Sequence, residues 1–213
     1  MSFDSLAVQF LNGLAGASTL FLLAVGLSLI FGVTRIVNFA HGSFYMLGIY
    51  VAYSVIARIG GSGLGFWFAI VLSAALVAVL GLIVELLLLR RIYQAPELFQ
   101  LLATFAVVLI VRDATLALWG SEDLLGPRAP GLKGAVEIFG HQFPQYDLVL
   151  IFIGPAVLGA LWWVLTRTRF GVLIRAATQD REMVGALGVN QAWLFSAVFA
   201  LGAFLAEIGR AHV

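Results

Sequence analysis

Long apolar runs are the feature that most constrains what this sequence can fold into. A membrane-spanning helix needs roughly 20 mainly apolar residues, and about six stretches approach or exceed that length. They lie at about residues 6–33, 43–57, 64–89, 98–119, 148–165 and 192–206. Hydrophobic residues make up 62% of the chain and charged residues 11%, an apolar excess that a soluble core does not absorb. We therefore expect an all-α fold, a polytopic bundle of about six transmembrane helices.

Charge and motif content exclude several classes of function. The formal net charge of +1 gives no basic field for nucleic acid, so no nucleic-acid partner is expected. The chain has no cysteine, which excludes cysteine catalysis. It lacks the GxxxxGK[ST], HExxH and GxSxG motifs, and its histidines His41, His141 and His212 are too scattered to nominate a metal or catalytic site. We expect a protein that is not an enzyme and that binds no metal or cofactor itself.

Lysine and arginine set the expected orientation in the membrane. One basic loop contains Arg90 and Arg91, and another covers residues 167–181. Two spans separate the loops, so both can lie on the cytoplasmic side, where short loops hold an excess of basic residues. The long connection over residues 120–147 then lies outside, and the N-terminus is expected outside as well.

A polar string, Val-Asn-Phe-Ala-His-Gly at residues 37–42, separates a long apolar run from an unusually short one. It predicts an interrupted helix. If the break lies at membrane depth, Asn38 and His41 face a polar pathway, as in transporters that use broken helices. If it lies in the cytoplasm, it is a turn anchored by Arg35, with Asn38 or His41 capping the next helix. The residues alone leave both interpretations open.

A second informative segment covers residues 166–190, where a polar stretch contains its own amphipathic helix. Gly188 is expected to stop this helix. Such a helix either docks into a groove of a partner or lies in the lipid headgroups, and both interpretations stay open on the residues alone. The expected apolar stripe consists of Ala176, Met183, Val184 and Leu187.

Three charged residues interrupt the apolar runs. Arg112 and Asp113 fall in the fourth run, and we expect them near its outer interface. Glu85 falls one turn before Arg90 and is expected to form a local ion pair with it. An ATP-independent secondary transporter or channel is the alternative function, in which Arg112 and Asp113 line the pathway.

Several separated strings together resemble the permease of the branched-chain amino acid ABC transporter family that carries the Asn-Phe-Ala-His-Gly string. The strings lie at residues 26–33, 36–48, 169–171, 175–180 and 187–190. The resemblance covers the chain to about residue 206. It implies a subunit of an ATP-driven importer for branched-chain amino acids or related small polar solutes. Importers of urea and short-chain amides share much of the pattern.

The resemblance also implies site residues and partners. Expected partners are a sister permease, two cytoplasmic ATPase subunits that hold ATP and Mg, an extracytoplasmic solute-binding protein, and the lipid bilayer of a bacterial or archaeal inner membrane. The residues implied for the signature near the translocation pathway are Asn38, Phe39, His41, Gly42 and Tyr45. Those implied for the ATPase-coupling loop, about residues 167–190, are Arg175, Ala176, Ala177, Asp180, Met183, Leu187 and Gly188.

The end of the sequence departs from the family pattern. Members of the family continue for several more helices, so residues 1–206 are expected to be a partial transmembrane domain of an importer. The remaining string, Glu-Ile-Gly-Arg-Ala-His-Val at residues 207–213, matches what a widely used sequencing adapter encodes in one reading frame. The sequence therefore predicts a C-terminally truncated chain with a non-native read-through tail.

Overall fold

The protein is a bundle of long helices, seen here in a computed structural model that describes residues 3–59, 63–121, 124, 129–132, 134–138 and 140–210. The long helices are α1 (Phe3–Thr34), α2 (Ala40–Ile59), α3 (Gly63–Val84), α5 (Glu97–Trp119), α6 (Gln145–Arg167) and α9 (Gln191–Arg210). Five helical stretches are long and apolar enough to cross a membrane, and α9 is apolar over Gln191–Glu207. Each predicted span coincides with one of these helices, which confirms the predicted all-α membrane bundle.

Shorter elements extend and connect the long helices. A π-helix, η1 (Glu85–Leu89), and a short helix, α4 (Arg90–Ile92), prolong α3. Two further helices, α7 (Arg169–Gln179) and α8 (Arg181–Ala186), fill the connection between α6 and α9. An antiparallel hairpin of β1 (Ala135–Ile138) and β2 (His141–Pro144) lies in the long connection before α6. The hydropathy pattern predicts the connection but not its hairpin.

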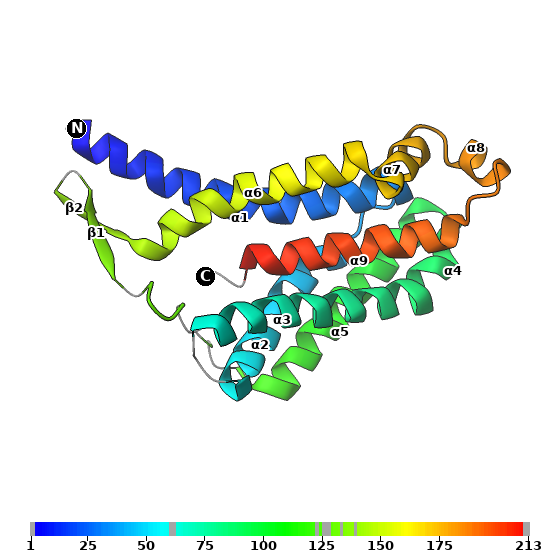
Figure 1. Cartoon of the computed structure of the whole chain (residues 1–213). Helices are drawn as coiled ribbons and strands as arrows, with labels where there is room; N and C mark the ends of the chain where they lie inside the picture. Colours follow the sequence, from blue (N-terminus) through cyan, green and yellow to red (C-terminus); the bar gives the residue numbers. More distant parts are fainter. Residues whose placement is uncertain are drawn as a thin grey trace.

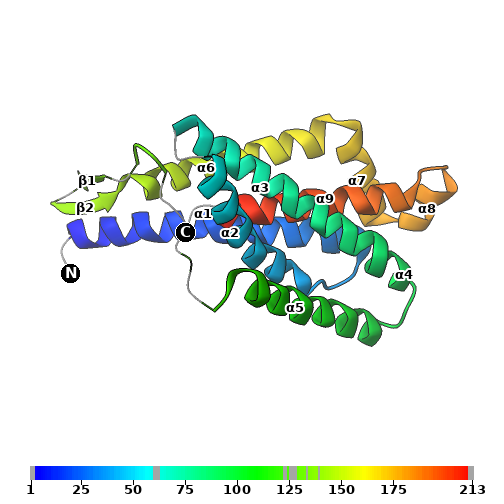
Figure 2. The same ribbon diagram turned by 90° about the horizontal axis from the view of Figure 1, so that it is seen from below.

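The last long helix runs through the middle of the bundle (Figure 1). It packs against α1, α2 and α3, while α6 lies beside α1 and α5 packs against α2. Both views place α4, α7 and α8 at one end of the bundle, and the N-terminus and the hairpin at the other (Figures 1 and 2). The two basic loops therefore share one end, called the basic end below.

Buried side chains from four of the spans meet around α9. Phe44 of α2 and Phe199 of α9 pack edge to face, with ring centroids 6.0 Å apart and an interplanar angle of 86°. Such aromatic contacts add to the free energy gained by burying the rings. The same cluster contains Ile30, Ala40, Val77, Leu89 and Val107. Helix α9 thus holds together segments that are far apart in the sequence.

Two glycines allow α1 and α9 to cross closely. A Cβ atom at Gly26 would lie 2.5 Å from the carbonyl oxygen of Gly202, and one at Gly202 would lie 2.6 Å from Cδ1 of Ile30. Small residues permit this approach of backbones in membrane helices, where packing replaces the hydrophobic effect as the cause of association. Any side chain at the crossing must push the two helices apart.

We expect Gly26→Ala to lower the free energy of unfolding by about 1–3 kcal/mol, because the added methyl group meets backbone rather than a movable side chain. Thermal unfolding of the purified protein in detergent measures this effect. The matched control is Gly16→Ala in the same helix, where a Cβ atom meets nothing within 4 Å. That control gains helix propensity without a clash, so equal stability of the two variants contradicts the close crossing.

Candidate functional site

The chain leaves α1 at Thr34 and runs without helical structure until α2 begins at Ala40. Arg35 has a φ of 57°, in the left-handed region that residues other than glycine adopt uncommonly. This residue reverses the chain direction. Beyond it the side chains alternate between the interior and the surface. Ile36, Asn38 and Ala40 are buried, whereas Arg35, Val37 and Phe39 are exposed.

A histidine contact fixes the depth of this interruption. His41 Nε2 donates a hydrogen bond to the carbonyl oxygen of Leu23 at 3.1 Å. Leu23 precedes the last residue of α1, Thr34, by eleven positions, or about 16 Å of helix. Helix α2 therefore begins beside a point about two-thirds of the way along α1 rather than at its end. The contact favours an interruption at membrane depth over a turn outside the bilayer.

Polar side chains bind the backbone groups that the interruption releases from helical pairing. The Thr34 hydroxyl donates to the carbonyl of Ile30 at 2.8 Å and accepts from the amide of Ile36 at 3.3 Å. Asn38 Oδ1 accepts from the amide of Ala40 at 3.1 Å, so Asn38 caps α2 as the alternative interpretation also expected. Irregular backbone inside a membrane protein requires such local partners.

The same motif leaves two buried polar atoms without a partner. Asn38 Nδ2 and His41 Nδ1 make no hydrogen bond with the described residues, although only 3% and 2% of these side chains is exposed. A buried polar group without a partner costs about 1–3 kcal/mol. The described contacts therefore pair Oδ1 of Asn38 and Nε2 of His41 but not the second polar atom of either side chain.

The five predicted pathway residues do not share one environment. Asn38 and His41 are both buried. The His41 ring lies near Gly26 of α1 and Gly202 of α9, and Asn38 lies near Thr34, Tyr93 and Phe199. Phe39 and Gly42 face outward instead, and Tyr45 is half-buried. The structure thus buries Asn38 and His41 beside different neighbours and leaves Phe39 and Gly42 exposed.

The predicted coupling segment is divided into two helices. Asp180 ends α7 and begins α8, where its Oδ1 accepts a hydrogen bond from the amide of Met183 at 2.9 Å. The stripe predicted for a single amphipathic helix is therefore split. Val184 turns inward to pack with Leu194, while Met183 stays 57% exposed. An aspartate at this spacing is a strong helix N-cap, a signal that interrupts the apolar periodicity.

Four of the predicted coupling residues are exposed in and around α8 at the basic end. We call Asp180, Met183, Leu187 and Gly188 the coupling tip. Leu187 is 76% exposed, and Gly188 has a φ of 85°, which confirms the predicted helix stop. Of the other predicted coupling residues, Arg175 is exposed, Ala176 is half-buried and Ala177 is buried.

A buried carboxylate ties α9 to the end of α3. Glu85 is fully buried in η1, and its Oε1 lies 3.6 Å from Arg90 Nε, as the sequence predicts. Tyr93 donates its hydroxyl to Oε1 at 2.7 Å, and Ser196 of α9 donates to Oε2 at 2.5 Å. Arg90 also donates to the carbonyl of Ala192 at 3.3 Å. We call Glu85, Arg90, Tyr93 and Ser196 the carboxylate network.

The sequence predicts the ion pair between Glu85 and Arg90 but not the hydrogen bonds from Tyr93 and Ser196. Tyr93 follows Glu85 by eight residues and Ser196 lies in a different span, so neither contact has a local signal. Burial, and then the hydrogen bond to Glu85, raise the pKa of the Tyr93 phenol, which keeps its hydroxyl a donor. The network connects α9, which follows the coupling segment, to α3.

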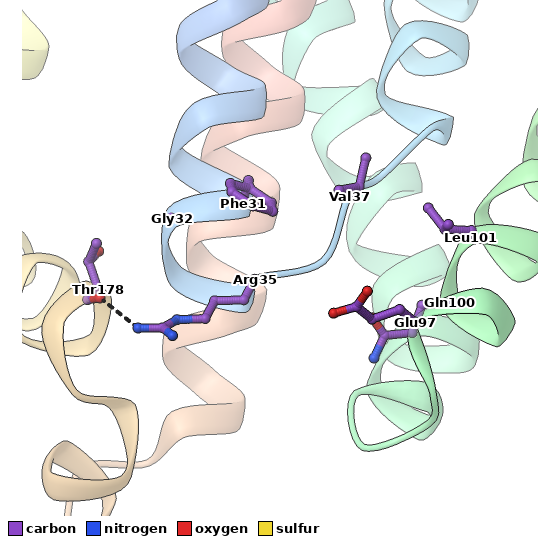
Figure 3. A pocket seen from close by; sticks show the side chains of 8 residues that line it. All are labelled: Phe31, Gly32, Arg35, Val37, Glu97, Gln100, Leu101 and Thr178. Carbon is purple, nitrogen blue, oxygen red and sulfur yellow. Dashed lines mark hydrogen bonds between the residues drawn. The ribbon is translucent and has the colours of Figure 1, made fainter.

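An open pocket of about 610 Å³ lies at the basic end, between α1, α5 and α7. Figure 3 shows Arg35 reaching from the end of α1 towards Thr178, and Glu97 on the opposite side at the start of α5. The Arg35 guanidinium donates to the Thr178 carbonyl at 3.4 Å. The lining residues are Phe31, Gly32, Arg35, Val37, Glu97, Gln100, Leu101 and Thr178.

The remaining charges inside the spans form no further site. Arg112 and Asp113 are exposed on α5, and Arg112 lies seven residues, about 10 Å, before the helix ends at Trp119. Neither makes a hydrogen bond or ion pair that joins it to the described part of the chain. In that same part, no three His, Cys, Asp or Glu side chains are grouped as metal ligands.

Comparison with known proteins gives matches over most of the chain. The sequence model of the family described as "Branched-chain amino acid transport system / permease component" matches residues 9–212. The high-affinity branched-chain amino acid transport system permease protein BraD of Pseudomonas aeruginosa is 28% identical over 211 residues, which cover 94% of this chain and 68% of that protein. Permease protein LivH of Escherichia coli K12 is 26% identical, with the same coverage. No solved structure matches.

We expect Tyr93→Phe to lower the free energy of unfolding by about 1.5–3 kcal/mol, because it removes a hydrogen bond to a buried charged group. Denaturant or thermal unfolding in detergent measures the change. The control is Tyr53→Phe, since Tyr53 is half-buried in α2 and its hydroxyl has no hydrogen bond to a described residue. Equal losses in the two variants argue against a stabilising carboxylate network.

Proposed function

The chain belongs to the family of branched-chain amino acid transport permease components, and from that membership we propose that it is the membrane subunit of an ATP-driven importer. In this proposal it forms a translocation pathway together with a sister permease. The observation that carries the proposal is the polar interruption between α1 and α2, where His41 binds the carbonyl of Leu23, eleven residues before the end of α1. Transporters place such breaks where a polar solute must pass through an apolar bundle.

Branched-chain amino acids are the proposed solutes. The printed names of the relatives BraD and LivH refer to branched-chain amino acid transport, and this supports the assignment to leucine, valine and isoleucine. Urea and short-chain amides are the alternative solutes, because their importers share much of the sequence pattern. The uptake experiment below separates the two classes directly.

Partner ATPases are proposed as the source of energy. The chain has no GxxxxGK[ST] loop, so in this proposal ATP and Mg are held by two cytoplasmic ATPase subunits. The coupling tip is proposed to dock on them. Its exposed Met183 and Leu187 are apolar anchors, and the Asp180 cap holds their backbone in place. Helix-in-groove recognition uses anchors of this kind.

The direction of the chain in the membrane follows from its arginines. The basic end gathers the arginines of the two predicted cytoplasmic loops (Figure 1), and positively charged loops favour the cytoplasmic side. We therefore place the coupling tip in the cytoplasm and the N-terminus outside. The hairpin β1–β2 then faces the side from which a solute-binding protein delivers its cargo.

A mechanical route from the ATPases to the pathway is part of the proposal. The coupling tip leads directly into α9, whose Ser196 is held by Glu85 in the carboxylate network. Helix α9 also crosses α1 at Gly26 and packs near His41. A displacement of the tip is therefore passed to the broken helix through side chains that are already in contact.

We expect Leu187→Asp to abolish ATP-dependent leucine uptake in vesicles that contain this permease, its sister permease, the ATPases and the binding protein. The carboxylate would have to be buried in the docking groove without a partner, which is costly. Stability should stay within about 0.5 kcal/mol, because Leu187 is 76% exposed. Uptake of labelled leucine, valine and urea, with and without ATP, measures function and names the solute.

The matched control is Leu187→Met, which keeps an apolar side chain of similar size at the same exposed position. It should retain uptake. A second variant, Asp180→Asn, keeps the helix cap and removes the charge, so it tests charge recognition at the tip separately. Uptake that continues without the ATPases sinks the importer assignment and favours the ATP-independent secondary transporter or channel.

A further inference from the structure

The outer face of α5 carries an aspartate inside the membrane span, and we propose that this face is the contact surface for the sister permease. In this arrangement a transmembrane helix of that subunit packs along α5 and presents a basic side chain to Asp113. The inference rests on the proposed function, which includes a sister permease, and it assigns that partner to one helix face of this chain.

Asp113 lies too deep on α5 to reach the water beside the membrane. The helix covers Glu97–Trp119, about 35 Å of helix against a hydrocarbon thickness of about 30 Å. Asp113 precedes Trp119 by six residues, or about 9 Å of helix. Its side chain is short, and side chains in a helix lean towards the N-terminus, here towards the basic end and away from the nearer membrane surface. The carboxylate therefore does not reach water as a long lysine or arginine side chain does.

The contacts of Trp119 support this depth. Its indole Nε1 donates to Ser54 Oγ of α2 at 2.7 Å, and its ring lies against Tyr50 with centroids 5.4 Å apart. Ser54 precedes the end of α2 at Ile59 by five residues, which is about 7–8 Å of helix. The end of α5 thus lies below the end of its neighbour, and Asp113 lies deeper still.

Asp113 also points away from the rest of the chain. Helix α5 lies at the edge of the bundle, where it packs against α2 and η1 (Figures 1 and 2). Thr104 is fully buried on the packed side, and Asp113 follows it by nine residues, or two and a half turns. The exposed carboxylate makes no hydrogen bond or ion pair with the part of the chain that the structure describes. Its partner is therefore expected from outside that part.

The face around Asp113 has the spacing of a packed helix surface. Steps of three and four residues keep side chains on one side of a helix and form ridges that fit the grooves of a neighbour. Lipid offers no partner for a carboxylate, and the apolar neighbours of Asp113 do not suit a water-filled channel. A protein helix satisfies both the apolar side chains and the charge. The exposed residues of this face are Leu102, Ala106, Leu109, Asp113 and Ala117.

Charge and position together point to the partner. Ionisable side chains inside a membrane pair with one another, so the helix that covers Asp113 is expected to carry an arginine or a lysine at the same depth. The start of α5 lines the same pocket as Val37, which belongs to the interruption between α1 and α2. Helix α5 therefore stands beside the proposed pathway. The sister permease is the subunit that completes this pathway, so it approaches the chain on this side.

Photo-crosslinking in the assembled transporter tests the surface. Benzoylphenylalanine in place of Leu109, a side chain that is 44% exposed, lies about one turn from Asp113 and reacts with the C–H groups in contact with it. We expect an adduct with the sister permease, in a helix that carries an arginine or lysine about one turn from the cross-linked residue. An adduct with lipid, with a second copy of this chain or within this chain overturns the surface.

The matched control places the same photo-reactive residue at Phe152. This side chain is 74% exposed on α6, which lies on the other side of the bundle from α5 (Figures 1 and 2). It should not give the adduct with the sister permease. Equal cross-linking from the two positions contradicts a contact that is specific to α5.

Replacement of the aspartate distinguishes a protein contact from a lipid contact by the sign of its effect. Asp113→Leu should lower the sister permease that co-purifies per amount of this chain at least about tenfold, because a buried basic side chain loses its partner. If Asp113 faces lipid, Asp113→Leu instead raises the thermal stability and leaves co-purification unchanged, and that result overturns the proposal. The control Asp4→Leu removes an exposed carboxylate from the first turn of α1 and should leave co-purification unchanged.

A reciprocal exchange identifies the paired residue. Asp113→Arg should prevent association, and an aspartate in place of the basic residue near the cross-link should restore it in the doubly changed complex. Failure of every such exchange argues against the ion pair, since the restored pair has the same two charges at the same depth.

Uptake measured in parallel separates this inference from the function on which it rests. If the adduct with the sister permease is absent while the same complex takes up leucine with ATP, the surface is assigned wrongly and the importer stands. If the adduct forms and Asp113→Leu weakens association, but uptake does not require ATP, the surface is correct and the importer assignment fails.

Discussion

The absence of water inside a bilayer is the constraint on which this structure depends. Every backbone amide and carbonyl at that depth must find a partner in the protein. The spans meet the demand mainly by helical pairing, and side chains supply further partners in the segment between α1 and α2. Thr34, Asn38 and His41 each bind a backbone group there. The polar string thus has a structural role of its own, because its side chains bind backbone groups that have no helical partner.

Helix α9 packs against α1, α2 and α3 and so connects spans that are far apart in the sequence. Glycines set its closest approach to α1, aromatic stacking joins it to α2, and Glu85 of η1 fixes its beginning through Ser196. These contacts differ in physical kind, and they lie at successive levels along one helix. Contacts along most of its length therefore fix α9 against its neighbours. This property suits an element that follows directly on the coupling tip.

Hydropathy predicted the spans well because length and apolar content are both dictated by the bilayer. It did not predict the depth of residues 35–39, since a polar string looks the same outside a membrane and in its middle. Asp180 divided the predicted coupling helix because capping competes with apolar periodicity. Ser196 and Tyr93 were missed because their contacts with Glu85 arise only from the tertiary fold. Contacts between residues close in the sequence could be predicted, whereas contacts between different spans could not.

Two arginine and glutamate pairs show how the fold uses the same chemistry in different ways. Arg90 and Glu85 lie 3.6 Å apart, and the carboxylate also accepts from two hydroxyl groups. That pair is occupied and structural. Arg35 and Glu97 line one pocket without pairing, on elements that the bundle holds apart. Arg35 donates instead to the Thr178 carbonyl of α7, so one arginine ties the end of α3 to α9 and the other ties the end of α1 to the coupling segment.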